Sequence, residues 1–257
     1  MSLSPLELAF VAGAGVVAGF LNALAGGGTL VSFPALTAIG IPAVDANLTN
    51  TVALSPGFLS GTVAQRHDLA GQRRRLVRML PAAALGGLAG GLLLVATSEE
   101  VFVDLVPWLI LFAVGLLIIQ PRLQRWLRGR AEHQGAADPG ADPWWAPAPI
   151  FVAAIYGGYF GAGNSVIFLA VLGVMLADPL PRLNVVKQGL SFTTNVTAAV
   201  FFVFSGKVVW AAALVMAVGA MGGAAIGGRL ASRLHPERFR WLVIAIGLAV
   251  AIAYFLR

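Results

Sequence analysis

Long apolar segments fill most of this sequence and constrain its fold more than any other feature. Several of them reach the roughly 20 residues that a helix needs to cross a bilayer. Charged residues make up only 11% of the 257 residues, whereas soluble domains contain about 25%. The sequence therefore predicts an all-α integral membrane protein, with apolar segments at 5–24, 28–40, 46–64, 76–97, 101–119, 148–163, 165–177, 185–204, 208–228 and 239–256.

Two of these segments, 28–40 and 165–177, are too short for an ordinary membrane crossing. Each follows a glycine-rich break, at 26–28 in the first case and at 161–163 in the second. Glycine tolerates the tight turns that such a break requires. We therefore expect each short segment to form a broken-helix hairpin with the apolar segment before it.

The two halves of the chain repeat the same motifs in the same order. The stretch 23–30 aligns with 159–166, the tripeptide 48–50 aligns with 193–195, and the glycine pair 86–87 aligns with 222–223. Three matches in one order indicate an internal repeat. The sequence thus predicts three parts, a first membrane repeat at 1–119, a cytoplasmic linker at 120–147 and a second membrane repeat at 148–257.

Clusters of arginine predict how these repeats lie in a membrane. Five arginines lie at 65–78, four at 120–147 and four at 229–240. Cytoplasmic loops carry an excess of Lys and Arg, so we expect these three regions inside and both termini outside. The halves then form two inverted repeats, each with three full crossings plus one hairpin, or about eight transmembrane segments.

The residue content excludes several classes of function. The chain has no cysteine, so it forms neither disulfides nor thiolate metal sites. His67, His133 and His235 have no partner at metal-ligand spacing, and no group of acids and histidines marks a catalytic centre. We therefore expect no metal, no cofactor and no enzymatic activity. Cytoplasmic arginines explain the net charge of +6, so this charge does not predict a nucleic-acid partner.

The two glycine-rich breaks are the first candidates for a binding site. Polar backbone inside a bilayer is tolerated where it is buried in protein or lines a cavity. A helix that begins at such a break directs its positive end at the turn, which favours an anion. The alternative is that the glycines only allow tight packing at a hairpin. The candidates in this group are Gly26, Gly27, Gly28, Thr29, Gly161, Gly163, Asn164 and Ser165.

Polar runs inside two apolar segments form the second group of candidates. Asparagine and threonine side chains donate hydrogen bonds to an oxyanion without carrying a permanent charge. The alternative is that they cap helices or bond across helix interfaces. Lys187, the cation closest to the second run, either neutralises the anion or snorkels to the cytoplasmic interface. The candidates in this group are Asn22, Asn47, Thr49, Asn50, Lys187, Gln188, Thr194 and Asn195.

Several of these motifs resemble those of the TauE/SafE family, also called the TSUP family of sulfite and sulfonate permeases. The resemblance covers the chain apart from the linker. The second glycine motif departs from the first because Ala162 and Asn164 stand where the first half has glycines. The motifs are GFLNALAGGGTLVSFPAL at 19–36, GIP at 40–42, ANLTNT at 46–51, GGYFGAG at 157–163 and GKVVW at 206–210.

The resemblance implies a secondary transporter that moves a small anion, such as sulfite or an organosulfonate, across the bacterial inner membrane. An anion-selective channel is the alternative, because facing half-helices also build ion-selective pores. The expected partners are the anionic solute and membrane lipid, and a homodimer is compatible with either function. The family resemblance leaves the solute, the direction of transport and the coupling ion open.

Overall fold

A computed structural model of the chain describes residues 3–24, 27–64, 72–134, 142–176, 178–230 and 236–256. Within these residues the chain forms ten α-helices and no β-strand, which confirms the predicted all-α fold class. The helices are α1 (Pro5–Leu24), α2 (Thr29–Ala38), α3 (Ala43–Ala64), α4 (Arg73–Ala96), α5 (Glu99–Gln134), α6 (Pro147–Tyr159), α7 (Asn164–Met175), α8 (Leu180–Val203), α9 (Trp210–Leu230) and α10 (Pro236–Phe255).

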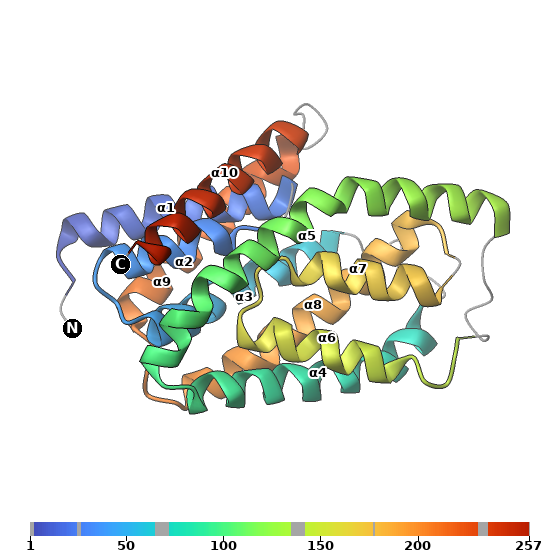
Figure 1. The fold of residues 1–257 in the computed structure, drawn as a ribbon, viewed down its shortest axis with the longest axis horizontal. Helices are drawn as coiled ribbons and strands as arrows, with labels where there is room; N and C mark the ends of the chain where they lie inside the picture. The colour runs from blue at the N-terminus through green and yellow to red at the C-terminus, as the bar shows by residue number, and fades with distance from the viewer. Residues whose placement is uncertain are drawn as a thin grey trace.

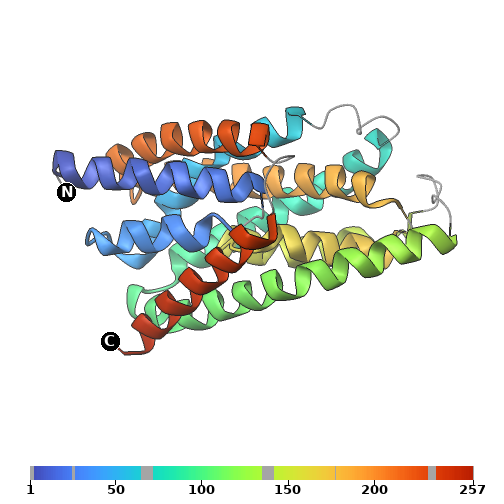
Figure 2. The same ribbon diagram turned by 90° about the horizontal axis from the view of Figure 1, so that it is seen from above.

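Two helical hairpins point into the molecule from opposite ends. In Figure 1 and Figure 2, α1 and α2 form a hairpin that opens toward the left end, whereas α6 and α7 form one that opens toward the right end. Both chain termini lie at the left end, and α5 ends at the right. α2 has 10 residues and α7 has 12, so at about 1.5 Å per residue neither crosses a bilayer core of about 30 Å. The predicted short helices are confirmed, while the number of full crossings stays a prediction.

The helices of the two halves pack in corresponding pairs. α1 packs against α9 as α6 packs against α4, α3 packs against α8, and α5 packs against α10. Glycines allow this close approach: a Cβ added at Gly223 of α9 would lie 1.9 Å from the Val16 carbonyl oxygen, and one added at Gly90 of α4 would lie 2.1 Å from that of Ile155. Such small-residue contacts are typical of membrane helices.

α5 is longer than the apolar segment predicted at 101–119. It continues past Pro121 to Gln134, so helix occupies the first half of the predicted linker. The extension contacts α7, because Arg130 Nη1 donates to the carbonyl oxygens of Gly173 and Val174 at 3.1 and 3.2 Å. The division of the chain into two repeats and a linker itself stays a prediction.

Hydropathy distinguishes the helices α3 and α8 from the other long helices. In the described part of the chain, α1, α4, α5, α9 and α10 are long and apolar enough to cross a membrane by length and composition. α3 and α8 have 22 and 24 residues but contain the polar runs singled out in the sequence. Because α3 and α8 pack against each other, they bring these runs into the interior, where the candidate site lies.

Candidate functional site

Asn164 is the first residue of α7 and directly follows a left-handed turn. Gly163 has a φ of +74°, a conformation that glycine adopts without the steric cost of a side chain. The turn places Asn164 inside the protein, where it is only 3% exposed and where neither Nδ2 nor Oδ1 has a hydrogen-bond partner among the described residues. A buried polar group without a partner costs about 1–3 kcal/mol. This amide is therefore a candidate ligand-binding group.

Residues of α6 and α8 surround this amide. A Cβ added at Gly157 of α6 would lie 2.3 Å from Asn164 Nδ2 and 2.8 Å from Thr194 Cγ2. The absence of a side chain at Gly157 thus allows Asn164 and Thr194 to lie close together. The Thr194 hydroxyl donates to the Leu190 carbonyl oxygen at 2.9 Å and lies 3.4 Å from the carbonyl oxygen of Ala83 on α4. Four helices of the molecule therefore meet around this position.

One face of α8 continues the polar surface next to Asn164. Ser191, Thr194 and Asn195 share this face because residues three and four apart are neighbours on a helix, and all three are buried. Asn195 Nδ2 donates to the Ser191 carbonyl oxygen at 2.8 Å, while the Ser191 hydroxyl has no hydrogen-bond partner within the residues that the structure describes. The face offers hydroxyl and amide groups but no permanent charge.

The corresponding run on α3 makes hydrogen bonds from the first half of the chain to the second. Asn47 Nδ2 donates to the Tyr159 carbonyl oxygen at 2.8 Å, and the Val209 N–H donates to the Thr49 hydroxyl at 3.0 Å. Asn47 and Thr49 thus fasten α3 to the end of α6 and to the segment before α9. The Oδ1 atoms of Asn47 and Asn50 are buried and have no hydrogen-bond partner in the described part of the chain.

Both glycine breaks contact the middle of α5. Gly27 has a φ of +84°, and a Cβ added there would lie 3.0 Å from the side chain of Leu117. A Cβ added at Gly163 would lie 3.2 Å from the side chain of Leu116. The structure therefore brings Gly27 and Gly163 to the same turn of α5. Among the described residues, no side chain caps the N-terminus of α2 or α7. The N–H groups of Leu30, Val31, Asn164 and Val166 already donate to carbonyl oxygens at the turns, so these helix ends offer a ligand mainly their partial positive charge.

The remaining predicted residues contribute less to this cluster. Gly28 is buried against α1, because a Cβ there would lie 2.4 Å from the carbonyl oxygen of Ala18. Lys187 Nζ donates to Asn184 Oδ1 at 3.1 Å, and its Cα lies two helical turns, about 10 Å, along α8 from that of Thr194. Gly26 lies outside the described residues. The half-buried members of the predicted set are Asn22, Thr29, Gly161, Ser165, Lys187 and Gln188.

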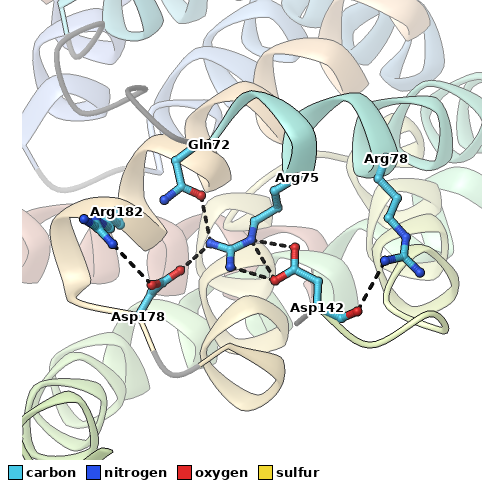
Figure 3. Close-up of polar contacts among 6 residues, drawn as sticks. All are labelled: Gln72, Arg75, Arg78, Asp142, Asp178 and Arg182. Atoms are coloured by element: carbon cyan, nitrogen blue, oxygen red, sulfur yellow. Dashed lines mark hydrogen bonds and ion pairs between the residues drawn. The ribbon is translucent and has the colours of Figure 1, made fainter. Parts of the chain in front are cut away.

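Sequence reasoning missed a buried ion-pair network at the start of α4 (Figure 3). Arg75, predicted only as one of the cytoplasmic arginines, is 1% exposed. Its guanidinium donates to Asp142 at 2.7 to 3.0 Å, to Gln72 at 2.8 Å and to Asp178. Removing one partner of a buried pair costs about 3–5 kcal/mol, so the network fastens α4 to the segments before α6 and α8. Each acid directly precedes a proline beside an apolar segment, a signal that could have marked it.

Comparisons with known proteins identify the family. Residues 11–254 match the family described as Sulfite exporter TauE/SafE. The "Probable membrane transporter protein" of Haemophilus influenzae is 29% identical over 234 residues, which cover 90% of this chain and 87% of that relative. The "Probable membrane transporter protein YfcA" of Escherichia coli K12 is 25% identical over 252 residues, which cover 95% of this chain and 88% of that relative.

A third relative, the "Probable membrane transporter protein ORF9" of a Sinorhizobium species, is 26% identical over 246 residues, which cover 95% of this chain and 91% of that protein. No solved structure matches the chain. The family match spans nearly the whole chain and its relatives are named as transporters, in agreement with the apolar helices described above. The chain therefore belongs to the TauE/SafE family and is a multi-pass membrane transporter.

Proposed function

We propose that the chain is a secondary transporter that carries a small oxyanion, sulfite or an organosulfonate, across the bacterial inner membrane. The observation that carries this proposal is the buried, unpaired amide of Asn164 at the N-terminus of α7. A helix N-terminus holds a partial positive charge, and hydrogen bonds are stronger in low-dielectric surroundings. An oxyanion at this position would accept a hydrogen bond from Asn164 Nδ2 and would face the positive end of α7.

The side chains next to Asn164 are consistent with a site that binds an anion and then releases it. Thr194 of α8 lies next to Asn164 through its Cγ2 methyl group, and Ser191 shares this face of the helix. The hydroxyl groups on this face are neutral. A site built from neutral donors holds an ion less tightly than one with a buried arginine, and transport requires binding that is weak enough for release. Neutral donors therefore suit a transporter, which must release the anion after binding it.

A sulfur oxyanion is the solute class that fits both the site and the family. The family description names sulfite, and sulfite and organosulfonates share an SO₃ group whose oxygens are acceptors. The oxygens of such a group match the amide donor of Asn164 and the partial positive charge at the start of α7. The direction of transport follows from the solute gradient and the coupling ion.

Binding by variants of Asn164 tests this proposal. Purified protein is screened by thermal shift and titration against sulfite, sulfate, thiosulfate, sulfoacetate, taurine and carboxylate analogues. Asn164→Ala loses one hydrogen bond to a charged group, about 1.5–3 kcal/mol, so we expect affinity to fall roughly ten- to a hundredfold. Asn164→Asp has nearly the same shape but adds a negative charge, so we expect it to abolish anion binding.

A matched control removes a polar group away from the cluster. The Thr37 hydroxyl on α2 donates to the Pro34 carbonyl oxygen at 3.1 Å, and Thr37→Ala should leave anion affinity unchanged. Normal anion affinity in Asn164→Asp would refute the site. Flux through proteoliposomes separates the two modes of transport, because a carrier saturates and shows counterflow, whereas resolvable single-protein currents would favour the anion channel.

A further inference from the structure

The break between α6 and α7 has two chemically different sides. α6 ends at Tyr159 and α7 begins at Asn164, with residues 160–163 between them. The C-terminal end of a helix carries partial negative charge and the N-terminal end partial positive charge. The proposed anion uses the α7 side, so the α6 side is left with a preference for a cation.

Among the described residues, two amide oxygens of α3 have no hydrogen-bond partner, and one of these amides lies against the end of α6. Asn47 Nδ2 donates to the Tyr159 carbonyl oxygen at 2.8 Å, which holds this amide against the end of α6 while its Oδ1 accepts nothing. Asn50 follows one turn later on the same face of α3, and its Oδ1 is also unpaired. The two residues are 1% and 2% exposed. Two unpaired acceptors in the interior call for a donor or a cation.

We infer that Asn47 and Asn50, together with the backbone at the end of α6, bind a sodium ion that is transported with the anion. Hard cations take oxygen ligands, and in carriers with broken helices, half-helix C-termini and unwound carbonyls coordinate Na⁺. The ligands are neutral, which favours a monovalent ion over divalent ions that call for carboxylates. Asp45 lies two residues from Asn47, so it points to another side of α3.

The two ions then bind cooperatively. This inference rests on the proposed function, because it needs an anion on the α7 side of the break. Opposite charges on the two sides of residues 160–163 attract each other strongly in a low dielectric. Thermodynamic linkage requires Na⁺ to raise the affinity for the anion by the same factor by which the anion raises the affinity for Na⁺. A sodium gradient would therefore drive anion movement.

The test measures Na⁺ and sulfite binding to the full chain in detergent, with Na⁺ replaced by K⁺ or choline at constant ionic strength. We expect Na⁺ alone to raise the melting temperature, and to raise sulfite affinity roughly tenfold or more. K⁺ and choline should do neither. An equal response to Na⁺ and K⁺ would overturn the inference, because it would show only a general salt effect.

Two variants separate the cation from the anion. Asn50→Ala should abolish the Na⁺-dependent rise in melting temperature, whereas Asn50→Asp, which keeps the oxygen ligands and adds charge, should retain or strengthen it. Asn164→Ala should lose the sulfite response and keep the Na⁺ response. A Na⁺ response that survives in Asn50→Ala overturns the inference.

Failure of the inference and failure of the proposed function give different results. Sulfite affinity that is identical in Na⁺ and choline would remove the sodium site while the anion transporter stands. Stabilisation by Na⁺ without binding of any oxyanion would keep the cation site and remove the proposed solute. Either result is visible in the same titration.

Discussion

The break before α2 and the break before α7 share a left-handed glycine, Gly27 in one and Gly163 in the other. The residue that follows differs, since the first half has Gly28 where the second has Asn164. Gly28 packs so tightly on α1 that it has no room for a side chain. Asn164 instead extends toward Gly157 and Thr194. The left-handed turn is therefore followed by a tightly packed glycine, Gly28, in the first half and by a buried amide, Asn164, in the second.

The large and the small residue occupy opposite positions in the two aligned hairpins. The alignment that pairs Gly28 with Asn164 also pairs Leu21 of α1 with Gly157 of α6. The first half thus combines a buried leucine with a glycine at the break, whereas the second combines a glycine with a buried asparagine. Protein interiors are close-packed. The Asn164 side chain therefore fits at the second break because Gly157 of α6 has no side chain there. An internal repeat can keep its backbone while only one copy acquires binding chemistry.

The polar runs show the same division of roles. On α3, Asn47 and Thr49 bond to backbone atoms of the other half. On α8, Thr194 and Asn195 donate to carbonyl oxygens of their own helix, and the Thr194 hydroxyl also lies 3.4 Å from the carbonyl oxygen of Ala83 on α4. The first run therefore makes its hydrogen bonds to the other half, whereas the second bonds mainly within its own helix.

The largest expected effect concerns the opposite orientation of the two hairpins in the membrane, which labelling of single cysteines tests. The chain has no cysteine, so single cysteines at Ser98 and Gln134 report which side of the membrane each end of α5 reaches. We expect impermeant thiol reagents to label Ser98→Cys from outside and Gln134→Cys from inside, because the arginine clusters lie near Gln134. Labelling of both from one side would break the inverted-repeat comparison.

The shared glycine turns predict the next largest effect, loss of transport. Gly27→Val and Gly163→Val add bulk beside α5 at the two left-handed turns that precede α2 and α7, so we expect both to abolish transport, measured as solute flux per amount of folded protein. Gly206→Val is the matched control, since Gly206 also has a positive φ, +70°, but a Cβ there meets nothing within 4 Å. Left-handed backbone costs a non-glycine residue about 1–2 kcal/mol in all three variants. Equal loss of transport in Gly206→Val would assign the effect to backbone strain alone.

The smallest expected effect distinguishes the two threonines of the polar runs. Thr49→Val leaves the Val209 N–H without its partner, which costs about 1–3 kcal/mol of stability, and we expect anion affinity to stay near normal. Thr194→Val removes a hydroxyl that bonds within its own helix at 2.9 Å and, at the longer distance of 3.4 Å, to the Ala83 carbonyl oxygen, so we expect a small loss of stability and weaker anion binding. Thermal unfolding and anion titration of both variants measure this contrast. The same loss of affinity in both would show that the two runs are equivalent.

Much of the helical framework was predictable because it depends on local properties. α1 begins and ends at the predicted residues, and the short helices α2 and α7 begin within one residue of prediction. Apolar run length and glycine content act over a few neighbouring residues, so they can be read without knowing the fold. α5 was the exception, because its extension to Gln134 contacts α7, far away in the sequence.

Local sequence patterns predict the all-α fold class, the glycine breaks and the family, and they include Asn164 among many candidates. The internal repeat that they indicate stays a prediction. The packing of the helices shows that, among the described residues, the Asn164 amide has no hydrogen-bond partner and Asn47 donates one hydrogen bond while its Oδ1 accepts none. It also shows that Arg75 is buried between Asp142 and Asp178 rather than solvated. The physical reason is that pairing and burial are properties of neighbours, and here those neighbours come from helices far apart in the chain.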